Sequence, residues 1–118
     1  MSLTTPDVCY SGPLPSLPDE ADARDLAEKF KALGDPVRLR LMTMVTAHPE
    51  GEVCVCEMTS HFDLTPATIS YHLKVLRKAG LIIGDRRGTW VYYRPTPDAL
   101  RRLSHVLGHP DGMALSTP

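Results

Sequence analysis

The stretch that decides the fold runs from residue 65 to residue 76 and reads TPATISYHLKVL. Its opening pair, Thr65-Pro66, is typical of a helix start, because threonine caps free N–H groups and proline fits the first turn. Ile69, Leu73 and Leu76 then recur at the i, i+4, i+7 spacing of one helical face. We therefore expect a helix that runs to Gly80 and turns this apolar face toward a core.

The opposite face of this expected helix carries small and polar side chains that suit DNA. At 100° per residue it holds Ala67, Ser70, Tyr71, Lys74 and Lys78. Such groups can reach base edges and phosphates in a major groove. Thr65 and Thr68 lie near the helix N-terminus, where free N–H groups favour a phosphate. Taken singly, the two lysines are better explained by an ordinary solvated face, so the neighbouring elements decide the interpretation.

The residues before this helix predict a helix-turn-helix. A short helix from about Val55 would turn Met58 and Phe62 inward, and the turn Asp63-Leu64-Thr65 joins it to the next helix. Two helices joined by so short a turn match the spacing of the DNA-binding motif.

The residues after it predict a β-hairpin. Leu81-Ile82-Ile83 and residues 89–93 are β-rich, and Asp85-Arg86-Arg87-Gly88 joins them. We expect Arg86 and Arg87 at the tip to act as a wing that reaches a minor groove or the DNA backbone. Solubility alone would also explain a charged tip, and the order of the three elements favours the wing.

Two more helices are expected before this module. Ser16 and Asp19 resemble a helix N-cap pair, and Gly34 closes the helix that follows. Its apolar stripe consists of Leu26, Phe30 and Leu33. Asp35-Pro36 begins the next helix, which is broken at residues 48–51.

A last helix begins at Asp98, with an apolar stripe of Leu100, Leu103 and Leu107. The expected organisation is a flexible arm at 1–18, a winged helix-turn-helix domain at 19–108 and a frayed tail at 109–118. The fold class is therefore mainly α with a small β-hairpin.

Charge is unevenly distributed along the chain. The total is −1, yet residues 65–94 hold six bases and one acid, a net +5 that leaves −6 for the rest. A basic module in an acidic frame suits a protein that touches phosphates on one face, although a solvated basic surface fits equally well. At 118 residues we expect one domain, and a dimer would add to its modest core.

Three cysteines, Cys9, Cys54 and Cys56, and no secretory signal argue against a disulfide scaffold. No apolar run approaches the length of a membrane span, so we expect no membrane partner. The expected location is cytoplasmic, where thiols stay reduced.

Three segments resemble the ArsR/SmtB family of winged-helix repressors: residues 31–40 (KALGDPVRLR), residues 65–76 and Ala79-Gly80-Leu81. The similarity runs from about Asp22 to Leu107. It implies a homodimer whose first and last helices form the interface, which places Leu26, Phe30, Leu33, Leu100, Leu103 and Leu107 there. It also implies that the apo-dimer represses double-stranded operator DNA and that a ligand releases it.

Cys54-Val55-Cys56 matches the Cys-Val-Cys box of arsenic- and cadmium/lead-sensing members of that family. Two thiolates are soft donors that select thiophilic ions over Mg²⁺ or Ca²⁺. Residues two apart on an ideal helix point about 200° apart, so the pair can chelate one ion only where the segment is irregular, as at a helix start. The alternative is that both cysteines are small buried apolar residues.

The resemblance leaves the third ligand open. Many arsenic sensors have a further cysteine three residues after the box, where this chain has Thr59. Cadmium/lead sensors add N-terminal cysteines, normally two, and this chain has only Cys9. Three thiolates suit As(III) or Sb(III), and also Pb(II), whereas four-coordinate Cd(II) or Zn(II) would lack a ligand. Whether Cys9 acts within its own subunit or across the dimer stays open.

The family's second metal site, on the last helix, is poorly matched. Asp98 fits its start, but Leu100 stands where a histidine is expected. His105 and His109 are four apart, and two imidazoles without a third ligand make a weak site. We interpret them as surface or capping histidines.

The sequence thus predicts a repressor, not an enzyme, with no organic cofactor and no small-molecule substrate. The expected inducer is As(III) or Sb(III). The alternatives are Cd(II) or Pb(II) on the same fold, a repressor that senses thiol oxidation, and, least favoured, a thiol redox enzyme. The enzyme hypothesis lacks a CxxC box beside a βαβ pattern.

Overall fold

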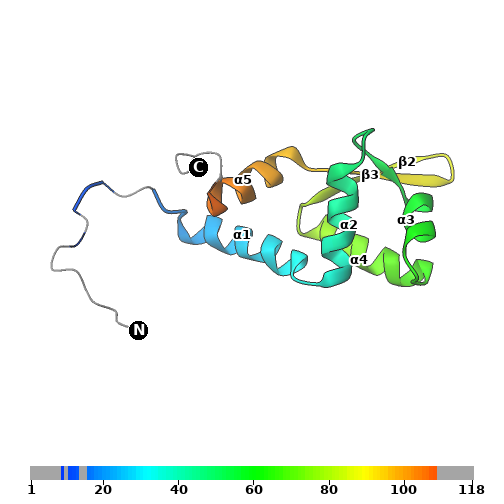
Figure 1. The fold of residues 1–118 in the computed structure, drawn as a ribbon, viewed down its shortest axis with the longest axis horizontal. Helices are drawn as coiled ribbons and strands as arrows, with labels where there is room; N and C mark the ends of the chain where they lie inside the picture. The colour runs from blue at the N-terminus through cyan, green and yellow to red at the C-terminus, as the bar shows by residue number, and fades with distance from the viewer. Residues whose placement is uncertain (1–8, 10, 14–15, 109–118) are drawn as a thin grey trace, which may run out of the picture.

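The computed structural model describes residues 9, 11–13 and 16–108 and has five helices and three strands among them (Figure 1). In chain order these are α1 (Glu20–Leu33), α2 (Pro36–Ala47), β1 (Val53–Cys54), α3 (Val55–His61), α4 (Pro66–Lys78), β2 (Ile82–Arg87), β3 (Trp90–Pro95) and α5 (Pro97–Leu107). The expectation of a mainly helical winged helix-turn-helix is confirmed. The predicted tail at 109–118 lies outside the described residues.

The core forms where α4 packs on α2, α1 and the sheet. Ile69, Leu73 and Leu76 are at most 2% exposed, so the face predicted to be apolar is the buried one. Met58 of α3 and Leu41 of α2 are fully buried beside them. Burying each such side chain contributes about 1.5–3 kcal/mol, which fixes α3 and α4 as a rigid helix-turn-helix.

Side-chain caps set where the helices begin. Asp19 accepts the N–H of Asp22 at 2.8 Å and is itself the N-cap of α1, so the expected pairing with Ser16 was wrong. Asp35 caps α2 as predicted. The last helix begins one residue before Asp98, because Pro97 fits the first helical position and Thr96 precedes it as the N-cap.

The sheet has three antiparallel strands in the order β1-β3-β2, one more than expected. The wing turn is also shorter than expected. Asp85, Arg86 and Arg87 belong to β2, and Gly88 begins a turn that Thr89 completes. Gly88 has a φ of 65°, which glycine adopts without strain and which a tight hairpin turn requires. The two arginines therefore lie on the strand that leads to the tip.

Figure 1 places α1 and α5 beside each other at one end of the domain and α3 with the β2–β3 hairpin at the other. The thiol-bearing segment and the wing are thus neighbours, and the expected dimer helices lie away from them. Within the described part of the chain, none of the helices is both long and apolar enough to span a bilayer.

Candidate thiol site and DNA-binding face

The two cysteines of the box meet where β1 gives way to α3. Cys54 is the N-cap of α3 and keeps an extended backbone (φ −75°, ψ 143°), whereas Cys56 is already inside the helix. This irregular start turns the Cys54 sulfur back toward Cys56, whose N–H donates to it at 3.2 Å. The two Cα atoms are 5.2 Å apart, and the sulfurs are joined as a disulfide. We expected two free thiols, and their closeness explains the bond.

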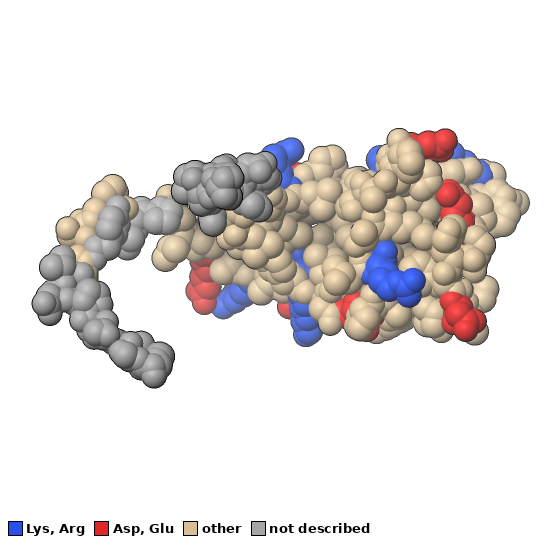
Figure 2. Space-filling model, in the orientation of Figure 1, with Lys and Arg blue, Asp and Glu red and all other residues tan. Residues whose placement is uncertain are grey.

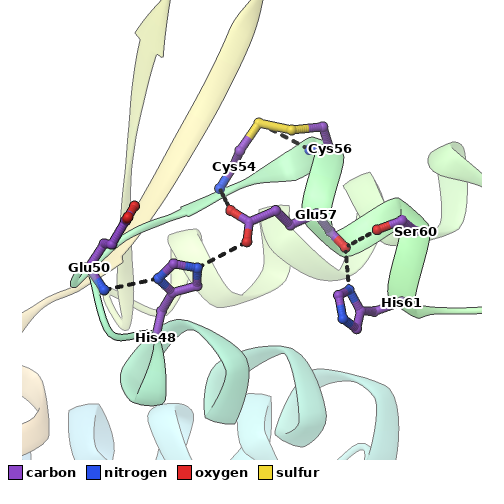
Figure 3. A network of polar contacts seen from close by, with 7 residues as sticks. All are labelled: His48, Glu50, Cys54, Cys56, Glu57, Ser60 and His61. Atoms are coloured by element: carbon purple, nitrogen blue, oxygen red, sulfur yellow. Dashed lines mark hydrogen bonds and ion pairs between the residues drawn. A yellow bond between two sulfur atoms is a disulfide. The ribbon is translucent and has the colours of Figure 1, made fainter.

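The side chain of Glu57 links this junction to the end of α2 (Figure 3). Its Oε2 accepts the backbone N–H of Cys54 at 3.3 Å, which completes a capping box, and its Oε1 lies 2.9 Å from Nε2 of His48. Nδ1 of His48 accepts the N–H of Glu50 at 3.1 Å, so Nε2 carries the proton and donates. The hydrogen bonds from His48 and then from Cys54 lower the pKa of the Glu57 carboxyl.

Our sequence reasoning missed Glu57 and His48. The spacing Cys54-x-x-Glu57 was a usable signal, because an acceptor at the third position after an N-cap is the mark of a capping box. Cysteine is an unusual N-cap residue, and we interpreted the two cysteines as metal ligands or small buried residues, not as a cap. The location of His48 beside Glu57 depends on how α2 packs and has no local signal.

The third predicted ligand, Cys9, is not brought to the other two. Cys9 is an exposed free thiol, and the described part of the arm that carries it extends beyond α1, at the end of the domain away from α3 (Figure 1). In the described ranges no three histidine, cysteine or acidic side chains are grouped for a metal ion. Thr59 is not a substitute ligand here, because its hydroxyl donates to the carbonyl of Cys56 at 3.0 Å.

The outer face of α4 is exposed as its sequence predicted. Its exposed residues are Thr65, Ala67, Ser70, Tyr71, Lys74 and Lys78, and Thr68 is half-buried. Tyr71 is 60% exposed, so its ring and hydroxyl are accessible on this face. The Thr65 hydroxyl oxygen accepts the N–H of Thr68 at 3.1 Å and so caps the helix. The face shown in Figure 2 has scattered charges of both signs and no continuous basic surface.

His72 is a packing residue that ties α4 to α2. Its Nδ1 accepts a hydrogen bond from Nη1 of Arg38 at 3.2 Å, and its side chain is 12% exposed. Nε of the same arginine donates to the carbonyl of Ala32 at 2.6 Å. Arg38 thus joins the end of α1, the start of α2 and the middle of α4, and it sets the angle at which α4 is presented. The role of His72 is therefore packing between the two helices.

The two wing arginines have different surroundings. Arg86 is exposed and has no ion pair within the described residues, so it is free to meet a phosphate. Arg87 instead pairs with Glu52 and Asp85. The hydrogen bond from Arg87 is the main cause that lowers the pKa of the Glu52 carboxyl. Of the two predicted DNA contacts, the geometry therefore favours Arg86.

The residues predicted for a dimer surface divide into three groups by burial. Leu26 and Leu103 are 7% and 6% exposed and belong to the core of the chain itself, because α1 and α5 turn them inward. Phe30, Leu33 and Leu100 are partly buried against that core. Leu107 is 70% exposed, and its neighbour Val106 is 45% exposed. An apolar surface remains at this end of the domain. His105 is exposed beside it, and His109 lies outside the described residues.

The fold and the exposed polar helix together are those of the winged helix-turn-helix class, whose members bind DNA. Residues 35–83 match the family model described as "Bacterial regulatory protein, arsR family". A regulator of Methanocaldococcus jannaschii is 36% identical over 65% of this chain and 84% of its own length. The chain belongs to the arsR family.

Several relatives have names that refer to metal resistance. "Arsenic resistance transcriptional regulator ArsR1" of Pseudomonas putida is 49% identical over 58% of this chain, which spans 52% of that protein. A "Cadmium resistance transcriptional regulatory protein CadC homolog" of Staphylococcus aureus is 33% identical over 67% of this chain and 64% of its own length. The crystal structure of a "possible transcriptional regulator for arsenical resistance" is 31% identical, with a TM-score of 0.61, over 74% of this chain and 84% of its own.

Proposed function

We propose that this protein is a metalloid-responsive repressor. A homodimer binds operator DNA through α4 and the wing, and As(III) or Sb(III) at the cysteines releases it. One observation carries the proposal: Cys54 and Cys56 are adjacent at the first turn of α3, the helix directly before the DNA-reading helix. In the reduced protein, this placement offers two soft donors to one thiophilic ion. The arsenic-resistance names of the relatives support the same inducer.

The proposed mechanism uses the rigid link between α3 and α4. An ion bound by both thiolates draws in the thiol of Cys9 and strains the start of α3. Met58 of α3 and Ile69 of α4 are fully buried in one core, so α4 cannot stay in place when α3 shifts. Two α4 helices of a dimer meet successive major grooves about 34 Å apart, and a small change in spacing lowers affinity. Coupling of about 1–3 kcal/mol, or about 5- to 150-fold, suffices.

The test is fluorescence anisotropy of the reduced protein on its own promoter DNA, titrated separately with arsenite, Cd(II), Pb(II) and Zn(II). Release by near-stoichiometric arsenite is expected. Cys54→Ser should abolish that release, and Cys9→Ser should weaken it. If the Cys54→Ser protein were still displaced by arsenite, the site assignment would be wrong.

A mixed dimer can decide where the third thiolate comes from. One chain carries Cys9→Ser, and the other carries Cys54→Ser with Cys56→Ser. Ligation across subunits leaves this dimer one complete site, because the first chain keeps the pair and the second keeps Cys9. Ligation within a subunit leaves none. Half-stoichiometric arsenite binding at wild-type affinity therefore means a shared site, and its loss means a site within one chain.

Two other inducers are favoured by specific observations. The cadmium-resistance name of one relative supports Cd(II) or Pb(II), and release by either ion without release by arsenite would establish it. The Cys54–Cys56 disulfide supports control by oxidation. Release by peroxide, reversed by a thiol reductant and absent with every ion, would establish that alternative.

A further inference from the structure

Arg87 holds the end of the wing to the segment that carries the cysteine pair. Its Nη1 and Nη2 donate to the two carboxylate oxygens of Glu52 at 2.6 and 2.8 Å, and its Nε donates to Asp85 at 3.1 Å. Its guanidinium also lies over the ring of Tyr92, 4.5 Å from the centroid. Carboxylates therefore bind the edge of the guanidinium, and the Tyr92 ring covers one of its faces. We call Arg87, Glu52 and Tyr92 the wing clasp.

Each partner in the wing clasp adjoins the cysteine pair. Glu52 lies two residues before Cys54, and Tyr92 is opposite Cys54 in the pairing of β1 with β3. β1 has just two residues, so few backbone hydrogen bonds hold its register. A bidentate carboxylate–guanidinium pair is directional as well as strong, and here it fixes the chain that leads into β1.

We propose that Arg87 is a positioning residue that couples the cysteine pair to the wing. When a ligand displaces Cys54, Glu52 and the end of β1 move with it, and the clasp carries the displacement into β2. The wing then leaves the orientation that fits DNA. This inference rests on the proposed function, because a ligand at the cysteine pair supplies the displacement.

The alternation of β2 separates this role from DNA contact. Neighbouring residues of a strand point to opposite faces, so Arg86 and Arg87 cannot serve the same partner. Arg86 is exposed and forms no ion pair within the described residues. A phosphate that reached Arg87 would have to compete with two carboxylates already in hydrogen-bonding contact. We therefore assign the phosphate contact to Arg86 and the coupling between the cysteine pair and the wing to Arg87.

Two variants of the wing clasp test the proposal, with the ratio of DNA dissociation constants with and without arsenite as the readout. Glu52→Gln removes one charge of the pair. Arg87→Lys keeps the positive charge that a phosphate would need but cannot form the bidentate contact with Glu52. Glu50→Gln is the matched control, because Glu50 is an exposed acid two residues away and only its backbone forms a hydrogen bond within the described ranges. Arsenite binding to the free protein is followed by ultraviolet absorption of the thiolate complex.

The expected result is specific to coupling. Without arsenite, Glu52→Gln and Arg87→Lys should bind DNA within about threefold of the wild-type affinity, and they should bind arsenite as well as wild type does. The ratio of their DNA dissociation constants with and without arsenite should nevertheless be at least about fivefold smaller than that of wild type. Glu50→Gln should match wild type. A combined Glu52→Arg and Arg87→Glu exchange should recover most of the ratio, because it restores an ion pair at the same place.

Other outcomes overturn the proposal in distinguishable ways. If both clasp variants were released as fully as wild type, Arg87 would have no part in coupling. If Arg87→Lys lost DNA affinity in the absence of arsenite while its ratio stayed unchanged, Arg87 would be a DNA contact. If arsenite failed to release the wild-type protein, the proposed function would fail first and this inference with it.

Discussion

Asp25 of α1 and Arg102 of α5 form an ion pair that joins the two helices at the end of the domain away from the wing. Nη1 of Arg102 donates to Oδ2 of Asp25 at 2.8 Å, and the same oxygen accepts from Nζ of Lys29 at 3.0 Å. The hydrogen bond from Arg102 and then that from Lys29 lower the pKa of the Asp25 carboxyl below its ordinary value of 3.8. The side chain of Lys29 is only 8% exposed, so Asp25 also neutralises a nearly buried charge.

We predict that Asp25→Asn destabilises the protein at neutral pH and that the difference disappears in acid. A carboxyl whose pKa is lowered by folding adds stability above its unfolded value, and this stability is lost as the pH falls through the folded value. Half of the Asp25 side chain is exposed, so the effect should be modest. Thermal unfolding at pH 7 and at a pH well below 3.8 measures it. Glu28→Gln, an exposed acid on the same helix, is the control and should change little.

A second prediction concerns the capping box at the cysteine pair. Glu57→Ala removes the acceptor of the Cys54 N–H and the partner of His48, so the start of α3 should fray. The arsenite affinity of the free protein should fall by about three- to tenfold, as expected for a lost capping interaction. Glu50→Ala removes an equal charge nearby and should have little effect. Equal affinities for the wild-type and Glu57→Ala proteins would mean that the box does not position the thiols.

The elements with strong periodicity could be predicted from the sequence. The apolar face of α4 recurs over three turns, and burial of Ile69, Leu73 and Leu76 followed it. The N-caps Asp35 and Thr65 were predictable for the same reason, because they act on residues two or three places away. Local rules of this kind also predicted a helix start near Val55, and α3 begins at that residue, between the two cysteines.

The hairpin shows where such rules stop. Asp85 to Gly88 has the composition of a turn, yet three of these residues continue β2, because each is opposite a residue of β3 and a glycine at the turn suffices to reverse the chain. β1 is too short to show any alternation and exists only because β3 pairs with it. Strand ends of this kind depend on a partner elsewhere in the chain.

The roles of polar side chains depended on contacts between distant residues. Arg87 reaches Glu52 across 35 positions, and Arg38 reaches His72 across 34. Neither pairing has a local pattern, so composition alone assigned Arg87 to DNA and left Arg38 without a role. The position of Cys9 relative to the cysteine pair has no local pattern either. In the proposed homodimer, Cys9 could approach the pair of its own chain or that of the partner.

A third prediction tests the contact between Arg86 of the wing and a DNA phosphate. Arg86→Ala should weaken operator binding and reduce the slope of log affinity against log salt by about 0.9, the value for one lost phosphate contact. Arg101→Ala on α5, whose side chain is 71% exposed, removes an equal charge away from the wing and should leave the slope unchanged. Anisotropy titrations over a series of salt concentrations measure both. An unchanged slope for Arg86→Ala would remove the wing from the DNA interface.

The fourth prediction concerns the apolar end of α5. Leu107 is 70% exposed and Val106 is 45% exposed, and a homodimer joined through the first and last helices would cover them. Leu107→Glu should raise the dimer dissociation constant at least about tenfold, because association would then bury an unpaired carboxylate. Sedimentation equilibrium over a range of concentrations measures it.

Leu39→Glu is the control, because Leu39 is 52% exposed and lies on α2. Its substitution adds the same charge to another exposed apolar position and should leave the dimer intact. If Leu39→Glu dissociated the dimer while Leu107→Glu did not, α2 would be the interface. The two subunits would then be joined through a different face. The distance from Cys9 of one subunit to the cysteine pair of the other would change with it.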